Sequence, residues 1–236
     1  MLPSVRNAAT ALALICIVAS VAWWTLFKSG VVTLYLVPGA VLHSGEVWQL
    51  ATWMFPAIDV TPVLFSALII WQCGGYLESW WGRRRFLTFT LVTTFVSGLL
   101  TVGVVALLAT FGINIMGALY TGGTVMGSML WVAQGLAIWN GQTNLFGYPM
   151  TGRTFAAIGV LLTALTGVFA GVAILIPEIF ALVIAFLYVR QGFPSNLLER
   201  LGSWRLQRRL AKRTSQLRVV SDGQRNTSSG SDKFLH

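Results

Sequence analysis

The chain has 236 residues, of which 56% are hydrophobic and only 10% are charged, and its mean hydropathy is +0.73. A soluble domain carries about 25% charged residues, so the composition excludes a water-soluble globular protein and indicates a surface that mostly faces lipid. The net charge of +9 belongs mainly to the C-terminal end, because ten of the sixteen Lys and Arg residues lie from Arg190 onward, and the length allows one membrane domain with a short basic tail.

Six apolar segments predict membrane-spanning helices, each of which needs about 20 residues. We therefore expect an all-α, polytopic membrane protein built as a six-helix bundle. The first segment ends in Trp23 and Trp24 without a small-residue cleavage site, so we interpret it as a spanning helix and not as a signal peptide. The predicted spans are 8–27, 60–77, 86–110, 119–139, 154–169 and 172–189.

The first loop, residues 28–59, is too long for a hairpin and too apolar for a freely solvated connection. Trp48, Leu50, Trp53 and Met54 recur at helical spacing. This pattern predicts a short amphipathic helix that lies in the membrane interface with Trp as its anchor.

Basic residues lie almost entirely on one side of the predicted bundle. Arg6, Arg83–Arg85, Arg153 and the tail share that side, and only Lys28 lies on the other. The positive-inside rule then places both termini in the cytoplasm, as an even number of spans also requires. Plasma and internal membranes are both possible, and the lack of a targeting sequence beyond the first span favours a bacterial inner membrane.

The sequence offers few metal ligands. Cys16 and Cys73 lie in apolar runs and are expected to be buried small hydrophobes, neither a disulfide nor a metal pair. His43 is a lone histidine in the first loop, and His236 is the last residue. A lone histidine is no metal site, so we expect neither a metal nor a cofactor.

A membrane domain of residues 1–192 is followed by a basic tail, residues 193–236, whose composition changes abruptly. The tail predicts an amphipathic helix on anionic lipid head groups, followed by a disordered end. The alternative is a charge that only fixes topology, and nucleic acid is not expected beside a membrane anchor. The predicted basic face comprises Arg205, Arg208, Arg209, Lys212 and Arg213.

Small residues crowd the stretch GALYTGGTVMGSML, residues 117–130. Gly122, Gly123 and Gly127 leave one side of this predicted fourth span nearly bare, as close helix packing requires. Gly167 and Gly171 form a GxxxG pair that predicts similar packing.

Three motifs in this order resemble the rhomboid superfamily over residues 45–135. They are GEVWQLATWMF in the first loop, GGYLESWWGRRRFLTF at the end of the second span, and GTVMG in the fourth. The resemblance extends more distantly to Golgi rhomboid-like proteins and derlins. Trp48, Thr52 and Glu78 match scaffold positions, with Gln49 replacing the usual arginine, and Glu78 is expected to brace the fold by accepting hydrogen bonds.

The resemblance implies a serine nucleophile in the fourth span, a histidine base in the sixth, and oxyanion donors in the second. The serine position falls on Gly122, and the second-span positions fall on Pro62 and Ser66. The base falls near Ile174. No histidine occurs between His43 and His236, so no shift in alignment restores the base.

The resemblance together with the missing groups predicts a catalytically inactive protein that binds transmembrane segments of other proteins in a lateral cleft. One alternative is an atypical intramembrane peptidase that uses Thr121 or Ser128 as nucleophile and Glu178 as base. Another is a small transporter, for which a single carboxyl deep in a span offers little support.

Overall fold

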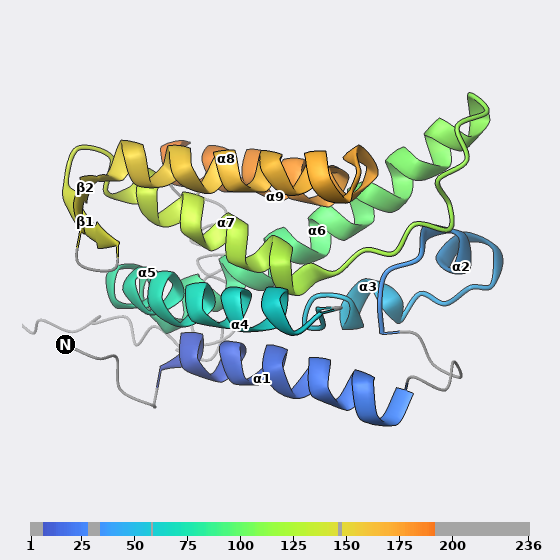
Figure 1. Ribbon diagram of the computed structural model, residues 1–236, viewed down its shortest axis with the longest axis horizontal. Coiled ribbons are helices and arrows are strands. Elements are labelled where there is room, and N and C mark those ends of the chain that lie inside the picture. Colours follow the sequence, from blue (N-terminus) through green and yellow to red (C-terminus); the bar gives the residue numbers. More distant parts are fainter. Residues whose placement is uncertain (1–6, 28–33, 58, 146–147, 192–236) are drawn as a thin grey trace, which may run out of the picture. The chain divides into compact units, whose positions relative to one another are not determined.

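The computed structural model describes residues 7–27, 34–57, 59–145 and 148–191 (Figure 1). The described residues belong to one compact unit, residues 1–192. The predicted tail helix lies outside the described residues, as does Lys28. The basic residues concerned are Arg205, Arg208, Arg209, Lys212 and Arg213.

The described part of the chain is built mainly of helices, which follow the apolar runs of the sequence. In chain order the elements are α1 (Ala8–Ala22), the π-helical turn η1 (Trp23–Phe27), α2 (Pro38–His43), α3 (Gln49–Thr52), α4 (Val60–Ile69), the π-helical turn η2 (Ile70–Gly74), α5 (Gly75–Trp81), α6 (Arg83–Thr110), α7 (Gly122–Ala137), β1 (Gln142–Leu145), β2 (Tyr148–Thr151), α8 (Gly152–Ala170), the 3₁₀ turn η3 (Val172–Ile174) and α9 (Leu175–Gln191).

Among the described residues, five helical segments are long and apolar enough to cross a membrane. The fourth predicted span corresponds to α7, whose length of about 24 Å is less than the ~30 Å of a typical hydrocarbon core. Most of its side chains are buried, and it packs against α4, α6, α8 and α9. The five long segments are Ala8–Thr25, Val60–Trp81, Arg83–Thr110, Gly152–Ala170 and Val172–Arg190.

The helices form layers around α7, with α8 and α9 on one side of it and α4 and α1 on the other (Figure 1). The turn between α5 and α6, the β1–β2 hairpin, the start of α8 and the end of α9 all lie at one end of this unit (Figure 1). That end therefore carries Arg83–Arg85, Arg153 and Arg190. We call it the basic end.

A carboxylate joins the first helix to the end of the second spanning segment. Glu78 of α5 accepts a hydrogen bond from the backbone N–H of Ala8 at 2.9 Å and another from that of Ala9 at 2.9 Å. The first N–H groups of a helix lack partners within the helix, and its N-terminus favours negative charge. Glu78 thus caps α1 from a distant part of the sequence.

The all-α prediction missed the hairpin of β1 and β2, which pairs Gln142 with Thr151 and Leu145 with Tyr148. The sequence between the fourth and fifth predicted spans is polar and rich in turn residues, which favours a loop in a local reading. Instead, the two strands pair with each other between the end of α7 and the start of α8, and this pairing supplies the regular structure.

The predicted interfacial helix of the first loop is wrong in its details. Between Trp48 and Met54 only Gln49–Thr52 are helical, and Trp53 is fully buried instead of anchoring the interface. Its indole lies against Gly98 of α6, where an added Cβ would approach Trp53 to 2.6 Å. Trp48 is the exposed tryptophan of this segment, at 48%, and Thr52 donates its hydroxyl proton to the Trp48 carbonyl.

The predicted GxxxG packing pair is wrong for Gly171, which has open space around it and a backbone φ of +101°. That left-handed conformation ends α8 and favours glycine. Gly167 does pack closely, because a Cβ there would collide with the Leu175 side chain across the turn into α9.

Candidate functional site

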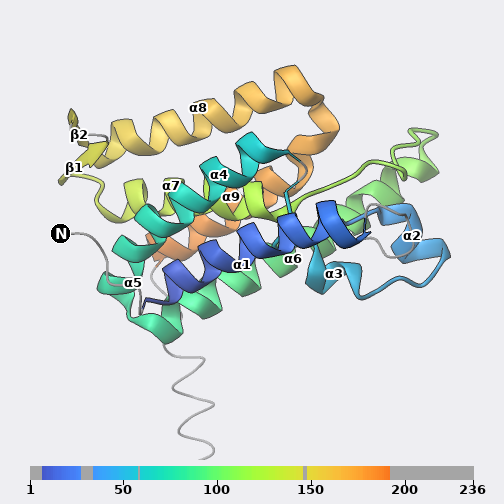
Figure 2. The ribbon, with the colours of Figure 1, turned by 60° about the horizontal axis from the view of Figure 1, so that its bottom comes forward.

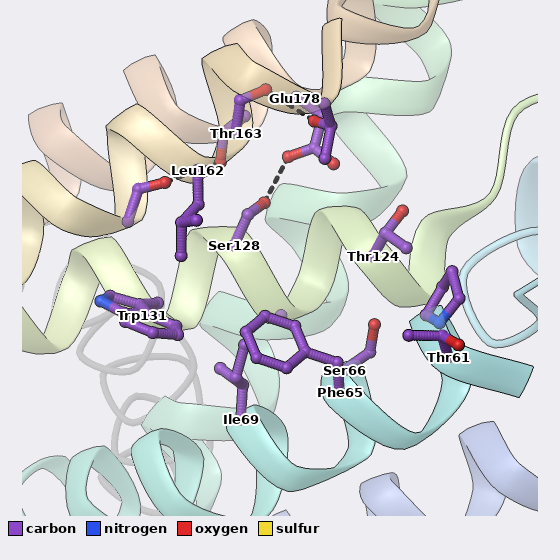
Figure 3. Close-up of a pocket in the computed structure, with 14 residues that line it drawn as sticks. Thr61, Phe65, Ser66, Ile69, Thr124, Ser128, Trp131, Leu162, Thr163 and Glu178 are labelled. Atoms are coloured by element: carbon purple, nitrogen blue, oxygen red, sulfur yellow. Dashed lines mark hydrogen bonds between the residues drawn. The ribbon is translucent and has the colours of Figure 1, made fainter. Parts of the chain in front are cut away.

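A cavity of about 250 Å³ lies over the middle of α7, between α4 and α8. We call it the α4–α8 cavity. Both helices pack on α7 but make little contact with each other. Figure 3 shows side chains from α4, α7, α8 and α9 converging on it. The lining residues are Thr61, Pro62, Phe65, Ser66, Ile69, Thr124, Gly127, Ser128, Trp131, Gly159, Leu162, Thr163, Thr166 and Glu178.

Two apolar side chains mark the outer border of the α4–α8 cavity. Phe65 of α4 is 45% exposed and Leu162 of α8 is 38% exposed, and both also line the cavity. Exposed apolar residues on long membrane-crossing helices face lipid. The cavity therefore borders the lipid-facing surface between α4 and α8.

The inner part of the cavity holds a buried carboxyl. Glu178 lies in the first turn of α9 and is 6% exposed, and the Ser128 hydroxyl of α7 donates a hydrogen bond to it. In Figure 3, Ser128 points toward Glu178 and away from α4. The structure thus brings together two residues that the sequence places fifty positions apart.

Trp131 closes one end of the cavity and ties α7 to α8. Its indole N–H donates to the Phe155 carbonyl at 2.8 Å, and its ring stacks on Phe155 at a centroid distance of 5.2 Å. Gly159 of α8 leaves room for the indole, since a Cβ there would approach it to 2.7 Å. These contacts hold the wall of the cavity in place.

Of the four positions that the family resemblance made candidates for lost catalytic groups, two line the cavity. Pro62 and Ser66 line it from α4, and Ser128 of α7 and Glu178 of α9 line it as well. Gly122 and Ile174 are not among its lining residues. Ile174 lies in the 3₁₀ turn before α9 and is 38% exposed, so the position four residues later, Glu178, supplies the polar group from this part of the chain.

The start of α7 offers no room for a serine nucleophile. A Cβ at Gly122 would approach the Met54 Cα to 2.5 Å and the Trp53 carbonyl oxygen to 2.7 Å. The backbone of the first loop fills the space beside Gly122, so the lateral cleft implied by the resemblance does not lie there. Gly123 is similarly close to the backbone of Phe55 and Pro56, whereas Gly127 does line the cavity.

The first N–H groups of α7 are also occupied. The Gly122 N–H donates to the Trp53 carbonyl at 2.7 Å, and the Gly123 N–H donates to the Pro56 carbonyl at 3.4 Å. Unpaired N–H groups at a helix start are the donors that would stabilise an oxyanion. Here these N–H groups already donate to carbonyl groups of the first loop, so they are not available to an oxyanion.

Thr121 lies apart from the carboxyl. It precedes α7 in an extended conformation, and its hydroxyl lies 3.4 Å from that of Thr124. It is not among the residues that line the α4–α8 cavity. Of the two predicted hydroxyl candidates, only Ser128 meets Glu178.

Chemically, the backbone of α7 around Ser128 offers no oxyanion donors to the Ser128–Glu178 pair. Ser128 lies within α7, where backbone N–H groups bond to carbonyls one turn earlier, and Thr124 donates to the Thr121 carbonyl.

The buried phenols of the loops, Tyr35 and Tyr120, are not bases at neutral pH. Burial, with Asp59 adding to it, raises the pKa of Tyr35 to about 12, and burial also raises the pKa of Tyr120.

Sequence reasoning missed the contribution of α8 to the cavity. Thr163 and Thr166 line it, with hydroxyls that donate to the Gly159 and Thr163 carbonyls. Their spacing, with Gly159 one turn earlier, marks one face of a helix that is otherwise apolar. That polar stripe is the signal that identifies the wall.

Long apolar helices that pack around a buried, partly polar cavity define an integral membrane protein with transmembrane helices. The chain belongs to the family described as eukaryotic integral membrane protein (DUF1751), whose profile matches residues 7–192. Comparison with curated proteins gives no match. The family corrects one prediction, because a eukaryotic membrane protein is not located in a bacterial inner membrane. Charge distribution reports which side of a membrane is cytoplasmic and not which organism owns the membrane.

Proposed function

We propose that this chain is a catalytically inactive, rhomboid-like protein of a eukaryotic membrane, in which α7, fourth in chain order, brings the number of spans to six and both termini are cytoplasmic. Its function is to bind the transmembrane segment of another membrane protein between α4 and α8. The single observation that carries this proposal is the α4–α8 cavity, which borders lipid and contains a buried carboxyl. The basic tail would hold to anionic head groups of the cytoplasmic leaflet.

The apolar border suits the hydrophobic side of a client helix. Phe65 and Leu162 stand on opposite walls of the cavity (Figure 3), and Leu161 and Leu64 nearby are 65% and 60% exposed. Lipid gives little hydrophobic drive for helix association, so close packing and polar contacts decide which helices associate. A client that packs between α4 and α8 would reach the polar interior.

The polar interior supplies the selectivity. A client helix with a small or polar residue, or with a locally unwound turn, exposes groups that cost several kcal/mol when unsatisfied in lipid. Ser128, Glu178, Thr163 and Ser66 line the space that such groups would enter. We expect clients with a polar residue near the middle of a spanning segment.

The start of α7 supports the proposed absence of catalysis. The space beside Gly122 and the N–H groups of Gly122 and Gly123 are taken by the first loop. A serine nucleophile needs a base and preorganised oxyanion donors, and neither is in place there. Binding without hydrolysis is the function that such a site supports.

Photocrosslinking in cells tests the proposal. A photoreactive amino acid at Phe65 or Leu162 is expected to crosslink a membrane protein through one of its spanning segments, identified by mass spectrometry of the crosslinked peptide. The same probe at Leu14 on α1 or Leu99 on α6 is the matched control, because these side chains are similarly exposed, at 52% and 49%. Glu178→Leu is expected to lower crosslinking at Phe65 severalfold.

Two results would overturn client binding at this cavity. One is equal crosslinking from all four positions, which would show unselective encounters in the bilayer. The other is crosslinking at Phe65 that is unchanged by both Glu178→Leu and Ser128→Ala, which would leave the polar interior without a role.

A second candidate function is an atypical serine peptidase, which the contact between Ser128 and Glu178 favours. A fluorophosphonate probe on the purified protein tests it, beside an active rhomboid protease as the positive control. Labelling that disappears in Ser128→Ala and persists in Thr121→Ala would replace our proposal with this one. No labelling is the result that we expect.

A further inference from the structure

A second groove lies on the opposite side of α8 from the α4–α8 cavity. It encloses about 670 Å³ between α8 and α9, with α7 as its floor. Its walls include Ala157 and Ala164 of α8 and Leu182 and Val183 of α9. We call it the α8–α9 groove. Both helices pack tightly on α7 but make far fewer contacts with each other, and Figure 2 shows them diverging from their shared turn.

The groove runs from an apolar interior to a cationic edge. Arg153, in the first turn of α8, is one of its lining residues. A smaller cavity of about 310 Å³ shares Leu136, Trp139 and Phe186 with the groove and is bordered by Arg190 at the end of α9. Both arginines therefore stand at the basic end, where α8 begins and α9 ends (Figure 1).

Aromatic rings hold the two guanidinium groups at this edge. The Arg153 guanidinium lies 5.2 Å from the centre of the Trp139 ring, and that of Arg190 lies 5.4 Å from the Phe186 ring. Arg153 also donates to Asn140 Oδ1 at 2.6 Å, which uses one of its five N–H donors. No acidic side chain is among the described residues that line either space.

The length of the groove matches one leaflet of a bilayer. From Arg153 to Ala164 the helix advances about 17 Å at ~1.5 Å per residue. Half of a typical hydrocarbon core is about 15 Å. An acyl chain lying along the groove would thus extend from the head-group level to the middle of the membrane.

We propose that the α8–α9 groove binds one anionic glycerophospholipid from the leaflet at the basic end. Its phosphate is held by Arg153 and Arg190, and an acyl chain lies along Ala157 and Ala164. Guanidinium groups bind phosphate through paired N–H donors. Basic pockets between transmembrane helices at the cytoplasmic side recognise such head groups, and tryptophan is favoured at that level.

Native mass spectrometry of the purified full-length protein tests this inference. After delipidation in detergent, the protein is given palmitoyl-oleoyl phosphatidylserine or the matching phosphatidylcholine. We expect Arg153→Gln with Arg190→Gln to lower phosphatidylserine retention about tenfold or more, from roughly fivefold per arginine near a membrane surface. Retention of phosphatidylcholine should change little.

The matched control is Arg83→Gln with Arg84→Gln, which removes the same charge from exposed positions at the same end of the unit. It is expected to retain phosphatidylserine as the unaltered protein does. Equal losses in the two double variants would show attraction to a general basic surface and would overturn the proposed site. Gel filtration and circular dichroism identify any variant that has failed to fold.

Ala157→Phe tests the acyl chain separately, because it narrows the groove without changing charge. We expect it to lower retention of phosphatidylserine severalfold. Retention equal to that of the unaltered protein would mean that only a head group is captured, and would overturn lipid binding in the groove. The α4–α8 cavity is not altered by these variants, so failure here leaves the client-binding proposal to its own test.

Discussion

The two spaces beside α8 place their polar groups at opposite depths. The α4–α8 cavity is apolar at its border and holds a buried carboxyl inside, next to Ser128. The α8–α9 groove is apolar inside and carries Arg153 and Arg190 at its edge. Polar groups deep in a membrane are costly and tend to serve a function, whereas arginine at the head-group level is favourable. One helix therefore separates a site suited to a polar group in mid-membrane from a site suited to an anion at the surface.

The largest expected effect comes from Gly135, where the backbones of α7 and α8 are in close contact. A Cβ at this position would approach the Ala156 nitrogen to 2.6 Å and the Gly152 oxygen to 2.7 Å. We expect Gly135→Leu to lower the free energy of unfolding by about 3 kcal/mol, as overpacking does, and to impair both spaces together. Thermal unfolding in detergent measures it.

Gly103→Leu on α6 is the matched control, because nothing lies within 4 Å of a Cβ there. It should unfold close to the temperature of the unaltered protein. Similar stability of the two variants would mean that α7 and α8 are not in the close contact described here.

The next effect is confined to the α4–α8 cavity. Ser128→Ala removes the donor to Glu178, and loss of a partner to a buried polar group costs about 1–3 kcal/mol. Adding Glu178→Met should recover part of that loss, because the orphaned carboxyl is then gone. Denaturation in detergent of the two single variants and the double variant gives the coupling.

Thr124→Ala provides the comparison within the same cavity, since its hydroxyl contacts the carbonyl and the hydroxyl of Thr121 in the same turn and not Glu178. Its effect should not depend on Glu178. Strict additivity of Ser128→Ala and Glu178→Met would contradict the contact.

A smaller effect is expected at Glu78, which lines neither space. Glu78→Ala removes both hydrogen bonds to the start of α1 and should cost about 1 kcal/mol, within the range of other helix caps. Glu78→Gln should cost less, because its amide oxygen still accepts. Neither variant is expected to change crosslinking at Phe65 or lipid retention, and a change in either would link α1 to sites that we treat as separate.

The smallest predicted effect is that of Arg153→Lys. It keeps the charge at the edge of the α8–α9 groove but loses paired hydrogen bonding to phosphate. Retention of phosphatidylserine should fall about twofold to threefold, which is below ~1 kcal/mol. Arg83→Lys serves as the control, and a larger loss there would move the anion site away from the groove.

The spanning helices were predictable because long apolar runs have few alternatives in a chain of this composition. The predicted segments 8–27 and 86–110 coincide with helices whose ends lie close to the predicted ends. The role of α7 was less accessible, because its shortness and its burial depend on the helices that surround it.

The candidate sites depend on contacts between residues far apart in the sequence, which the pattern within one segment does not reveal. Gly122 was interpreted as the position of a lost serine. The structure gives a steric reason for glycine there, because the backbone of Trp53 and Met54 leaves no room for a Cβ. Trp53 fitted an interfacial pattern, but Gly98, far along the chain, creates the space that buries it. Glu178 could be singled out as a carboxyl in an apolar segment, while its meeting with Ser128 required the packing of α7 against α9.

The cap on α1 has a consequence for how the chain is made. Ala8 and Ala9 emerge from the ribosome before the carboxylate that accepts their hydrogen bonds, which follows 70 and 69 residues later. Until that stretch of nascent chain has entered the bilayer, the start of the first helix depends on water or on the insertion machinery for its hydrogen bonds. The first span therefore reaches its final state only after the second span has been synthesised, so insertion of the first two spans is completed as one event.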